Sequence, residues 1–433
     1  MCTNWSIFAA TLFFDIENRH RTKRQMRRIV ALLALALTAL VGAHGQALDY
    51  IDTEANHIAM NGDNWDALRQ RLAAIATQQH RVSFVQIGDS HIQADWSASV
   101  LRRRLQSHFG NGGRGCVAAL RLAGTNQPTD YRLTADSAAL CASRLLAREW
   151  KAGMGVTGVA VTFASPERQL HIATDAECGA FGHITLLHQP GPGYATAMIA
   201  DSLYVGEPVA PWATRYTLPA EVDSLTLRTS FDSPFCGAYL QRSGAGVELN
   251  AIGNNGACFS SYLKIPDFAL HTSLFGPSLI ILSMGTNEAF GTESDEQICQ
   301  SIDTLVAQLR AANPGVKFLL TTPMECHKKA WRTTKKRVRK GCYRTRRSMA
   351  FVTNRRIAEV RNLIVRYGRE HKIPVWDLYA VAGGEGAAAK WIADGLMNPR
   401  DHVHCLKSGY ELRGSLLSDA LLEVLADDAS QAM

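Results

Sequence analysis

Four polar side chains at separate places in the sequence have the types and spacing needed for nucleophilic acyl transfer. Ser90 ends the tripeptide Gly-Asp-Ser, Asn287 follows Gly-Thr, and Asp401 precedes His404 by three positions. A serine hydroxyl is a weak nucleophile, so it needs a base to take its proton and a carboxylate to orient that base. An amide NH2 group can stabilise the negative charge on the attacked oxygen. These residues are therefore the first candidates for a catalytic site.

Ser90 comes where the apolar run 84–87 gives way to a helical pattern. This position corresponds to the carboxyl end of a strand, where open α/β sheets place their chemistry. The following helix offers unpaired backbone N–H groups, and Gly88 allows the chain to bend. The tripeptide alone fits equally well an ordinary turn in which Ser90 only caps the helix. Partners elsewhere in the chain have to decide between these interpretations.

Apolar runs and helical spacing alternate along both ends of the chain. Strands are predicted near 84–87, 247–252, 278–283, 316–321 and 373–377, and helices near 63–79, 96–109, 294–312, 350–371 and after His404. This alternation predicts a parallel sheet with helices on both faces. Since parallel strands end at one edge, Ser90, Gly256 and Asn287, which follow three of these strands, are expected to converge there.

Residues 119–245 show a different pattern, with short alternating runs separated by Gly, Pro and Asp. This pattern predicts a β-sandwich or jelly roll inserted into the α/β domain. The predicted organisation is an upstream extension with a signal peptide (1–45), a first α/β part (46–118), the inserted β domain (119–245) and a second α/β part (246–433). The glycine-rich tract 109–115 follows a helix, so we expect it to line the cleft rather than to bind phosphate.

Four short motifs, in this order, resemble the blocks of the SGNH hydrolase superfamily, the GDSL-type esterases. They are residues 88–90, 255–257, 285–287 and 401–404. The resemblance implies a three-layer α/β/α, flavodoxin-like fold. It also implies that Ser90 is the nucleophile and that His404 is the base, oriented by Asp401. The oxyanion donors would be the N–H groups of Ser90 and Gly256 and the side-chain amide of Asn287. We prefer Gly256 to Gly253, which can simply terminate the strand.

Longer strings are similar to the periplasmic peptidoglycan O-acetylesterases. They comprise residues 87–93, 109–115, 255–257 and 401–410. That family carries a noncatalytic β-sandwich, resembling a carbohydrate-binding module, between its first two blocks. The resemblance implies removal of acetyl esters from the 6-hydroxyl of muramic acid in peptidoglycan. The alternatives are an acetyl esterase or acetyltransferase acting on another polysaccharide, and, from a different class, a noncatalytic glycan-binding protein.

Each candidate residue also has a purely structural interpretation. Asp401 could be no more than an N-terminal cap of the last helix, and Asn287 could be an ordinary turn residue. His91 adjoins Ser90, so we expect it to shape the turn rather than to act as the base. Asp89 is expected to organise the same turn through bonds from its side chain to the backbone. No cluster of ligand-type residues has metal-binding spacing, so neither a metal nor another cofactor is expected.

The first 45 residues have the features of a leader. From Met26, two arginines precede a short apolar run and an Ala-x-Gly site that ends at Gly45. This arrangement is typical of a secretory signal peptide, and the apolar run is too short to span a bilayer comfortably. We therefore expect a periplasmic or secreted protein. Nine cysteines would remain, with Cys326 and Cys342 as the first candidates for a disulfide.

Charge is concentrated in one segment. Without residues 1–45 the chain has 40 basic and 37 acidic residues, so its overall charge gives no argument for a nucleic-acid partner. Residues 328–347 hold eleven basic residues and no acidic one, among them Lys335, Lys336, Arg337, Arg339 and Lys340. We interpret this segment either as a solvated basic loop or as a docking site for an anionic polymer or membrane surface in the cell envelope.

Overall fold

The computed structural model describes residues 48–426, apart from positions 137, 166, 192–195, 231 and 340. The predicted leader and Lys340 therefore lie outside the described residues. The chain divides into two units, Met1–Ile51 and Asp52–Met433, and everything that follows concerns the second unit.

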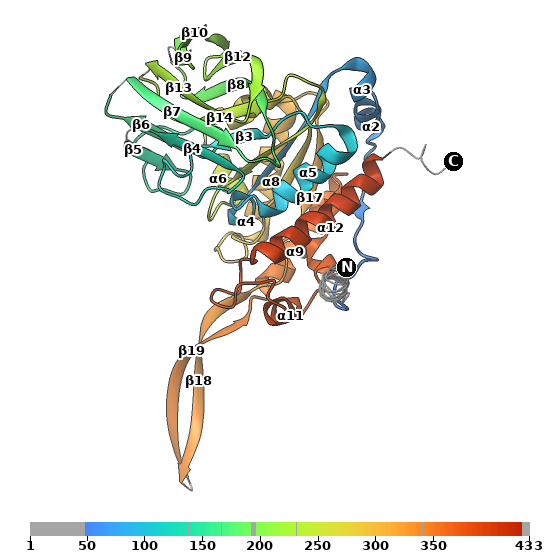
Figure 1. Ribbon diagram of the computed structural model, residues 1–433. Coiled ribbons are helices and arrows are strands. Elements are labelled where there is room, and N and C mark those ends of the chain that lie inside the picture. Colours follow the sequence, from blue (N-terminus) through green and yellow to red (C-terminus); the bar gives the residue numbers. More distant parts are fainter. Residues whose placement is uncertain are drawn as a thin grey trace, which may run out of the picture. The chain divides into compact units, whose positions relative to one another are not determined.

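A sheet of mainly parallel strands forms the centre of this unit (Figure 1). In the described residues its order is β1 (Ile58–Ala59), β20 (Val375–Trp376), β17 (Lys317–Thr321), β16 (Pro277–Ser283), β2 (Arg81–Gly88) and β15 (Gly246–Gly253). Only the edge strand β1 pairs antiparallel within it. Numbered along the chain, the parallel strands follow the order 2-1-3-4-5, which is the flavodoxin-like arrangement. The direction of winding changes between β2 and β16, and a switch point of this kind is where open α/β sheets bind ligands.

Helices cover the sheet on both faces. One layer contains α5 (Trp96–Phe109) and α12 (Lys407–Leu425), which pack on each other, and α5 also packs on β15. The other contains α6 (Phe259–Tyr262), α7 (Phe268–Thr272), α8 (Asp295–Ala312) and α9 (Arg356–Glu370). Val85 and Ile87 of β2 join a fully buried cluster with Ile302 and Leu305 of α8. The predicted α/β/α layering follows from these contacts.

Shorter helices complete the α/β part. They are α2 (Asp66–Ala73), α3 (Ile75–Gln78), α4 (Ser90–Gln93), the 3-10 helix η1 (Ser273–Phe275), α10 (Leu378–Val381) and α11 (Ala387–Ala393). Ser294 caps α8 together with Gln297, so the helix predicted near 294–312 is confirmed. The helix predicted from position 350 begins only at Arg356, because the preceding residues pair as a strand.

Residues 115–241 form two further sheets in the described part of the chain. One has the order β10 (Ser202–Val205), β9 (Thr196–Ile199), β13 (Ser224–Ser230), β7 (Glu167–Thr174) and β4 (Tyr131–Ala135). The other has β11 (Glu207–Ala210), β12 (Ala213–Val222), β8 (Phe181–His188), β14 (Phe235–Gln241), β6 (Val159–Phe163) and β5 (Ala139–Arg144), and β3 (Gly115–Ala118) pairs with β14. Leu170 and Leu227 of the first sheet share a buried cluster with Ile184 and Leu186 of the second. The domain boundaries at 118/119 and 245/246 stay a prediction.

The basic segment is a hairpin rather than a loop, so the prediction of a loop is wrong. Strand β18 (His327–Arg339) pairs antiparallel with β19 (Cys342–Thr353), and Figure 1 shows the hairpin extending away from the central sheet. Its turn contains Gly341 with a φ of 79°, a backbone conformation that glycine adopts easily. Cross-strand pairs of large side chains, such as Trp331 with Met349, explain why this highly charged segment forms strands.

The cysteines do not form the predicted pair. Cys326 is a buried free thiol, so the disulfide with Cys342 is wrong. Within the described residues, no group of three or more His, Cys, Asp or Glu side chains is arranged to hold a metal ion. A search of the same residues finds no helix with the length and apolar character needed to cross a membrane.

Candidate active site

Three of the predicted site residues form a hydrogen-bonded chain. His404 Nε2 lies 2.9 Å from Ser90 Oγ, and His404 Nδ1 lies 3.1 Å from Asp401 Oδ2. In the tautomer that donates Nδ1–H to Asp401, Nε2 is free to accept the hydroxyl proton of Ser90. The structure thus brings together residues 314 positions apart in the sequence, in the geometry that proton transfer from serine requires.

Asp401 is fixed by its own turn. Its Oδ1 accepts hydrogen bonds from the backbone N–H groups of Val403 and His404, at 2.9 and 3.0 Å. Its Oδ2 also accepts from the side-chain amide of Asn398 at 3.2 Å. Burial alone would raise the pKa of Asp401, but these hydrogen bonds and the neighbouring His404 outweigh burial and lower it. Asp401 is therefore held ionised beside His404, and it organises its turn as well as orienting the histidine.

The turn that carries Ser90 is organised by Asp89. Its buried carboxylate accepts a hydrogen bond from the backbone N–H of His91 at 2.8 Å, as the sequence predicted. Burial raises the pKa of Asp89 to about 6. Gly88 is required just before it, because an added Cβ would lie 2.7 Å from the carbonyl oxygen of Ser283 on the neighbouring strand. These contacts fix Ser90 at the start of α4.

His91 is directed away from the Ser90 hydroxyl. Its Nδ1 lies 3.0 Å from the hydroxyl of Tyr410 and 3.2 Å from the guanidinium of Arg413. Burial, with a smaller contribution from the Arg413 charge, lowers the pKa of His91 well below its ordinary value. The buried, neutral imidazole packs beside the ring of His404, with ring centroids 5.3 Å apart. This position suits a residue that shapes the turn.

Gly256 and Asn287 lie on the same cavity as Ser90. Gly256 has a φ of 81° in the turn closed by the hydrogen bond from Ala257 N to Asn254 O. The side-chain amide of Asn287 donates to the carbonyl of Ala257 at 3.0 Å and has a longer contact, 3.4 Å, with Asp89. Gly253 ends β15 instead, tight against the backbone of Gln93. The structure places Gly256 rather than Gly253 beside the serine.

Sequence analysis missed two residues that fix the backbone near the site. Gln93 holds the turn that contains Gly256, and Glu288 holds the start of α6. Gln93 Oε1 accepts the backbone N–H of Asn255 at 2.7 Å, and its amide donates to the backbone carbonyl of Asn126 at 2.9 Å. Glu288 accepts the backbone N–H of Phe259 at 2.8 Å, and burial raises its pKa to about 8. Both could have been suspected from spacing, since Gln93 lies one helical turn after Ser90 and Glu288 directly follows the asparagine at the strand end.

The cavity beside Ser90 has a volume of about 710 Å3. Besides the residues described above, its lining includes the side chains Trp96, Asn126, Phe290, Asn398, Val403 and Tyr410. Amide groups and aromatic rings together suit a polar ligand with an apolar face. Lys335, Lys336, Arg337 and Arg339 lie on the exposed hairpin instead and do not line this cavity.

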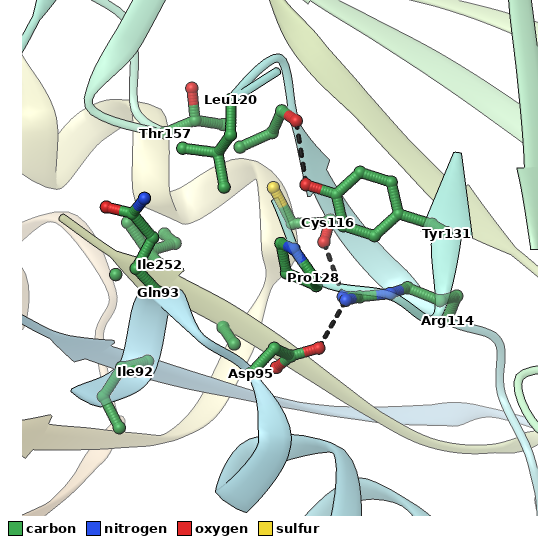
Figure 2. A pocket seen from close by; sticks show the side chains of 13 residues that line it. Ile92, Gln93, Asp95, Arg114, Cys116, Leu120, Pro128, Tyr131, Thr157 and Ile252 are labelled. Carbon is green, nitrogen blue, oxygen red and sulfur yellow. Dashed lines mark hydrogen bonds and ion pairs between the residues drawn. The ribbon is translucent and has the colours of Figure 1, made fainter. Parts of the chain in front are cut away.

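A second, very small cavity marks a structural cluster rather than a site. Figure 2 shows Arg114 directed at Asp95 and at the carbonyl of Cys116, with Tyr131 alongside. Arg114 and Arg102 pair with the two carboxylates Asp95 and Asp130, all of them buried or nearly so. Arg114, near the end of the glycine-rich tract 109–115, belongs to this cluster. The expectation that the tract lines the cleft is therefore wrong.

Comparison with known proteins gives a family match over part of the chain. Residues 223–412 match the GDSL-like Lipase/Acylhydrolase family, and this range includes Gly256, Asn287, Asp401 and His404 while Ser90 lies outside it. This part of the chain is therefore similar to the GDSL-like lipase/acylhydrolases, and the match supports an esterase. A search of curated protein sequences gives no match.

One solved structure supports the fold. A peptidoglycan O-acetylesterase is 21% identical, covers 85% of this chain and 99% of its own, and superimposes with a TM-score of 0.69. Two others match with low TM-scores. The lipase/acylhydrolase from Enterococcus faecalis has a TM-score of 0.28 at 18% identity, covering 41% of this chain and 76% of its own. The family two carbohydrate esterase from Cellvibrio japonicus has a TM-score of 0.29 at 11% identity, covering 68% and 98%.

Proposed function

We propose that this chain is an exported serine esterase that removes O-acetyl groups from cell-wall glycan, with peptidoglycan as the preferred substrate. The observation that carries the proposal is the hydrogen-bonded chain from Ser90 through His404 to Asp401, which opens into a cavity lined by Gly256 and Asn287. A serine, a base and an orienting carboxylate in this arrangement form the triad used for acyl transfer on several unrelated folds.

The reaction proceeds in two halves. Ser90 Oγ attacks the carbonyl carbon of the acetyl ester while His404 Nε2 takes the hydroxyl proton. The bond from the carbonyl carbon to the sugar oxygen then breaks, and His404 returns the proton to that oxygen, leaving acetyl-Ser90. In the second half a water molecule attacks the acetyl carbon, His404 takes one of its protons, and the bond to Ser90 Oγ breaks with the proton returned to Ser90. The products are acetate and a free sugar hydroxyl.

Negative charge develops on the carbonyl oxygen in each half. The backbone N–H groups of Ser90 and Gly256 and the amide of Asn287 are the donors that we assign to it. The Asn287 amide donates to the carbonyl of Ala257 at 3.0 Å. Its second contact, with Asp89 at 3.4 Å, is long enough to be exchanged easily for a bond to substrate. One such donor is worth about 3 to 4 kcal/mol of transition-state stabilisation.

The substrate and the location rest on separate arguments. Export rests on the signal-like residues 26–45. The glycan substrate rests on the sequence resemblance, and the fold shared with a peptidoglycan O-acetylesterase supports it. The two sheets of residues 115–241, which share a buried core, are proposed to form a glycan-binding module.

Acetate release from O-acetylated peptidoglycan and from acetylated xylan tests the proposal. Wild type is expected to release acetate from peptidoglycan, Ser90→Ala to release none, and Ser107→Ala, at an exposed serine on α5, to behave as wild type. Release from xylan alone would replace the substrate, and a requirement for an acceptor sugar would favour acetyl transfer. Failure of wild type on both polymers would leave a noncatalytic glycan-binding protein as the better interpretation.

A further inference from the structure

The hairpin formed by β18 and β19 is exposed along most of its length. Between positions 328 and 349 the described side chains are exposed, apart from the half-buried Ala330 and Ser348. The exposed set includes large apolar groups, with Trp331 63%, Tyr343 62% and Val338 66% exposed. A two-stranded sheet alone is at best marginally stable in water, so a hairpin of this length is expected to gain stability from a surface that covers it.

The strand register divides the hairpin into two unlike faces. Because side chains alternate along a strand, residues paired across the strands share a face. One face, here called the aromatic face, holds Lys329, Trp331, Lys335 and Arg337 on β18 and Tyr343, Arg347, Met349 and Phe351 on β19. The opposite face holds the basic residues Lys328, Arg332, Lys336, Arg344 and Arg346, with small and polar side chains and Val352.

Cations and rings are in direct contact on the aromatic face. The guanidinium of Arg347 lies 5.3 Å from the ring centre of Trp331, and the ammonium of Lys329 lies 5.5 Å from that of Phe351. The Arg347–Trp331 pair offers a positive group directly beside an exposed apolar ring, whereas Phe351 is half-buried at the base of the hairpin. This is the combination found in segments that lie in the interface of a bilayer, where aromatic rings enter the headgroup layer and basic groups meet lipid phosphates.

We propose that the aromatic face docks on an anionic lipid bilayer and holds the enzyme at the membrane surface. The segment 327–353 contains no Asp, Glu, Asn or Gln. Carboxylates and side-chain amides commonly bind the hydroxyls of neutral sugars, so their absence here favours lipid over a neutral polysaccharide. A bare polyanion would be bound by the charges alone and would leave Trp331, Tyr343 and Met349 without a role. The proposal does not depend on the esterase reaction.

The base of the hairpin connects this surface to the active site. His327 donates its backbone N–H to the carbonyl of His402 at 3.0 Å, and the ring of Phe351 stacks on the ring of His402 with centroids 3.6 Å apart. His402 lies between Asp401 and His404. With a rise of about 3.3 Å per residue, the hairpin tip lies roughly 40 Å from this base. Docking would thus hold the active site within a limited distance of the membrane.

Vesicle co-sedimentation with the full-length mature protein tests the proposal. Wild type is expected to bind vesicles of phosphatidylglycerol and phosphatidylcholine, to bind pure phosphatidylcholine weakly, and to lose binding as salt rises. Trp331→Ser with Tyr343→Ser keeps the charge and is expected to weaken binding about tenfold, because two interfacial rings are removed. The emission of Trp331, taken as the difference from Trp331→Phe, should shift to shorter wavelength on binding.

A matched pair of charge variants distinguishes the two faces. Lys335→Gln with Arg337→Gln on the aromatic face is expected to weaken binding about thirtyfold, at about 1 kcal/mol per charge. Arg332→Gln with Arg344→Gln removes the same charge from the opposite face, farther from the lipid, and is expected to weaken binding less than about threefold. Equal losses from the two pairs, unchanged binding in the Trp331 and Tyr343 variant, or stronger binding to polyphosphate or insoluble peptidoglycan than to vesicles would overturn the proposal.

Discussion

The edge of the sheet that carries Ser90 and the hairpin that carries Trp331 are built on opposite principles. At the sheet edge, buried groups hold each functional side chain through hydrogen bonds, as Asp89 and Gln93 do for the turns on either side of Ser90. On the hairpin, charged and aromatic side chains face solvent and are held mainly by pairing between two strands. Chemistry requires fixed distances, whereas attachment to a fluid surface requires charge and apolar area without a fixed partner geometry.

Removing a member of the hydrogen-bonded chain should have the largest effect. Ser90→Ala and His404→Ala are each expected to lower kcat for p-nitrophenyl acetate by about ten-thousandfold or more, because nucleophile and base act as a unit. The double variant should be no worse than either single one. If the losses in kcat of the two single variants were fully additive in the double variant, the two side chains would act independently. The sheet edge would then not differ from the hairpin in holding its functional side chains as a unit.

Loss of the Asn287 amide comes next. Asn287→Ala is expected to lower kcat by about a hundredfold to a thousandfold with little change in KM, since an oxyanion donor acts mainly in the transition state. Asn255→Ala is the matched control, because it removes an amide from the same cavity while the Asn255 backbone contact with Gln93 stays. Similar losses in both variants would remove the special role of Asn287.

Glu288 predicts a moderate, pH-dependent effect on stability. Its pKa is about 8 in the folded chain against an ordinary value of 4.5, so the folded state holds the proton more tightly. This contribution to the unfolding free energy is present below pH 4.5 and is lost as pH rises through 8. The melting temperature of Glu288→Gln should therefore fall less than that of wild type between pH 5 and pH 8. The exposed Glu370→Gln should follow wild type, and a Glu288→Gln curve parallel to wild type would contradict the assignment.

The smallest effect is expected on the hairpin. Lys335→Gln with Arg337→Gln should change turnover of p-nitrophenyl acetate by less than about twofold, and stability by less than about 0.5 kcal/mol, because both side chains are exposed and lie outside the cavity. Thermal melting and initial rates measure both. A large loss on this small, soluble ester would show that the hairpin is part of the catalytic machinery, which would erase the distinction between the two regions.

Sequence analysis predicts the sheet edge well, because its residues follow from local patterns. A buried strand followed by Gly-Asp-Ser places Ser90, and the Asp-x-x-His spacing places His404 beside Asp401. Gln93 and Glu288 were missed, because their spacing from Ser90 and Asn287 suggests only that they lie near the site and does not reveal their hydrogen bonds to distant backbone N–H groups. The hairpin was predicted as a loop because charged residues occur on both faces of its strands, so the sequence shows no alternation of apolar and polar residues. Its strand pairing is set by contacts between the two strands across the turn. Cys326 shows the same limit, since spacing in the sequence cannot show that it stays a free, buried thiol.

The most direct test of the central claim is to label the nucleophile. Mature wild-type protein incubated with a fluorophosphonate should gain one adduct by intact mass, and peptide mapping should place it on Ser90. His404→Ala should label far more slowly, because the hydroxyl then lacks its base. Ser90→Ala should not label at all, and Ser107→Ala should label as wild type does. Labelling of Ser90→Ala at the wild-type rate, or a folded wild type that takes up no adduct, would contradict the assignment of Ser90 as the nucleophile.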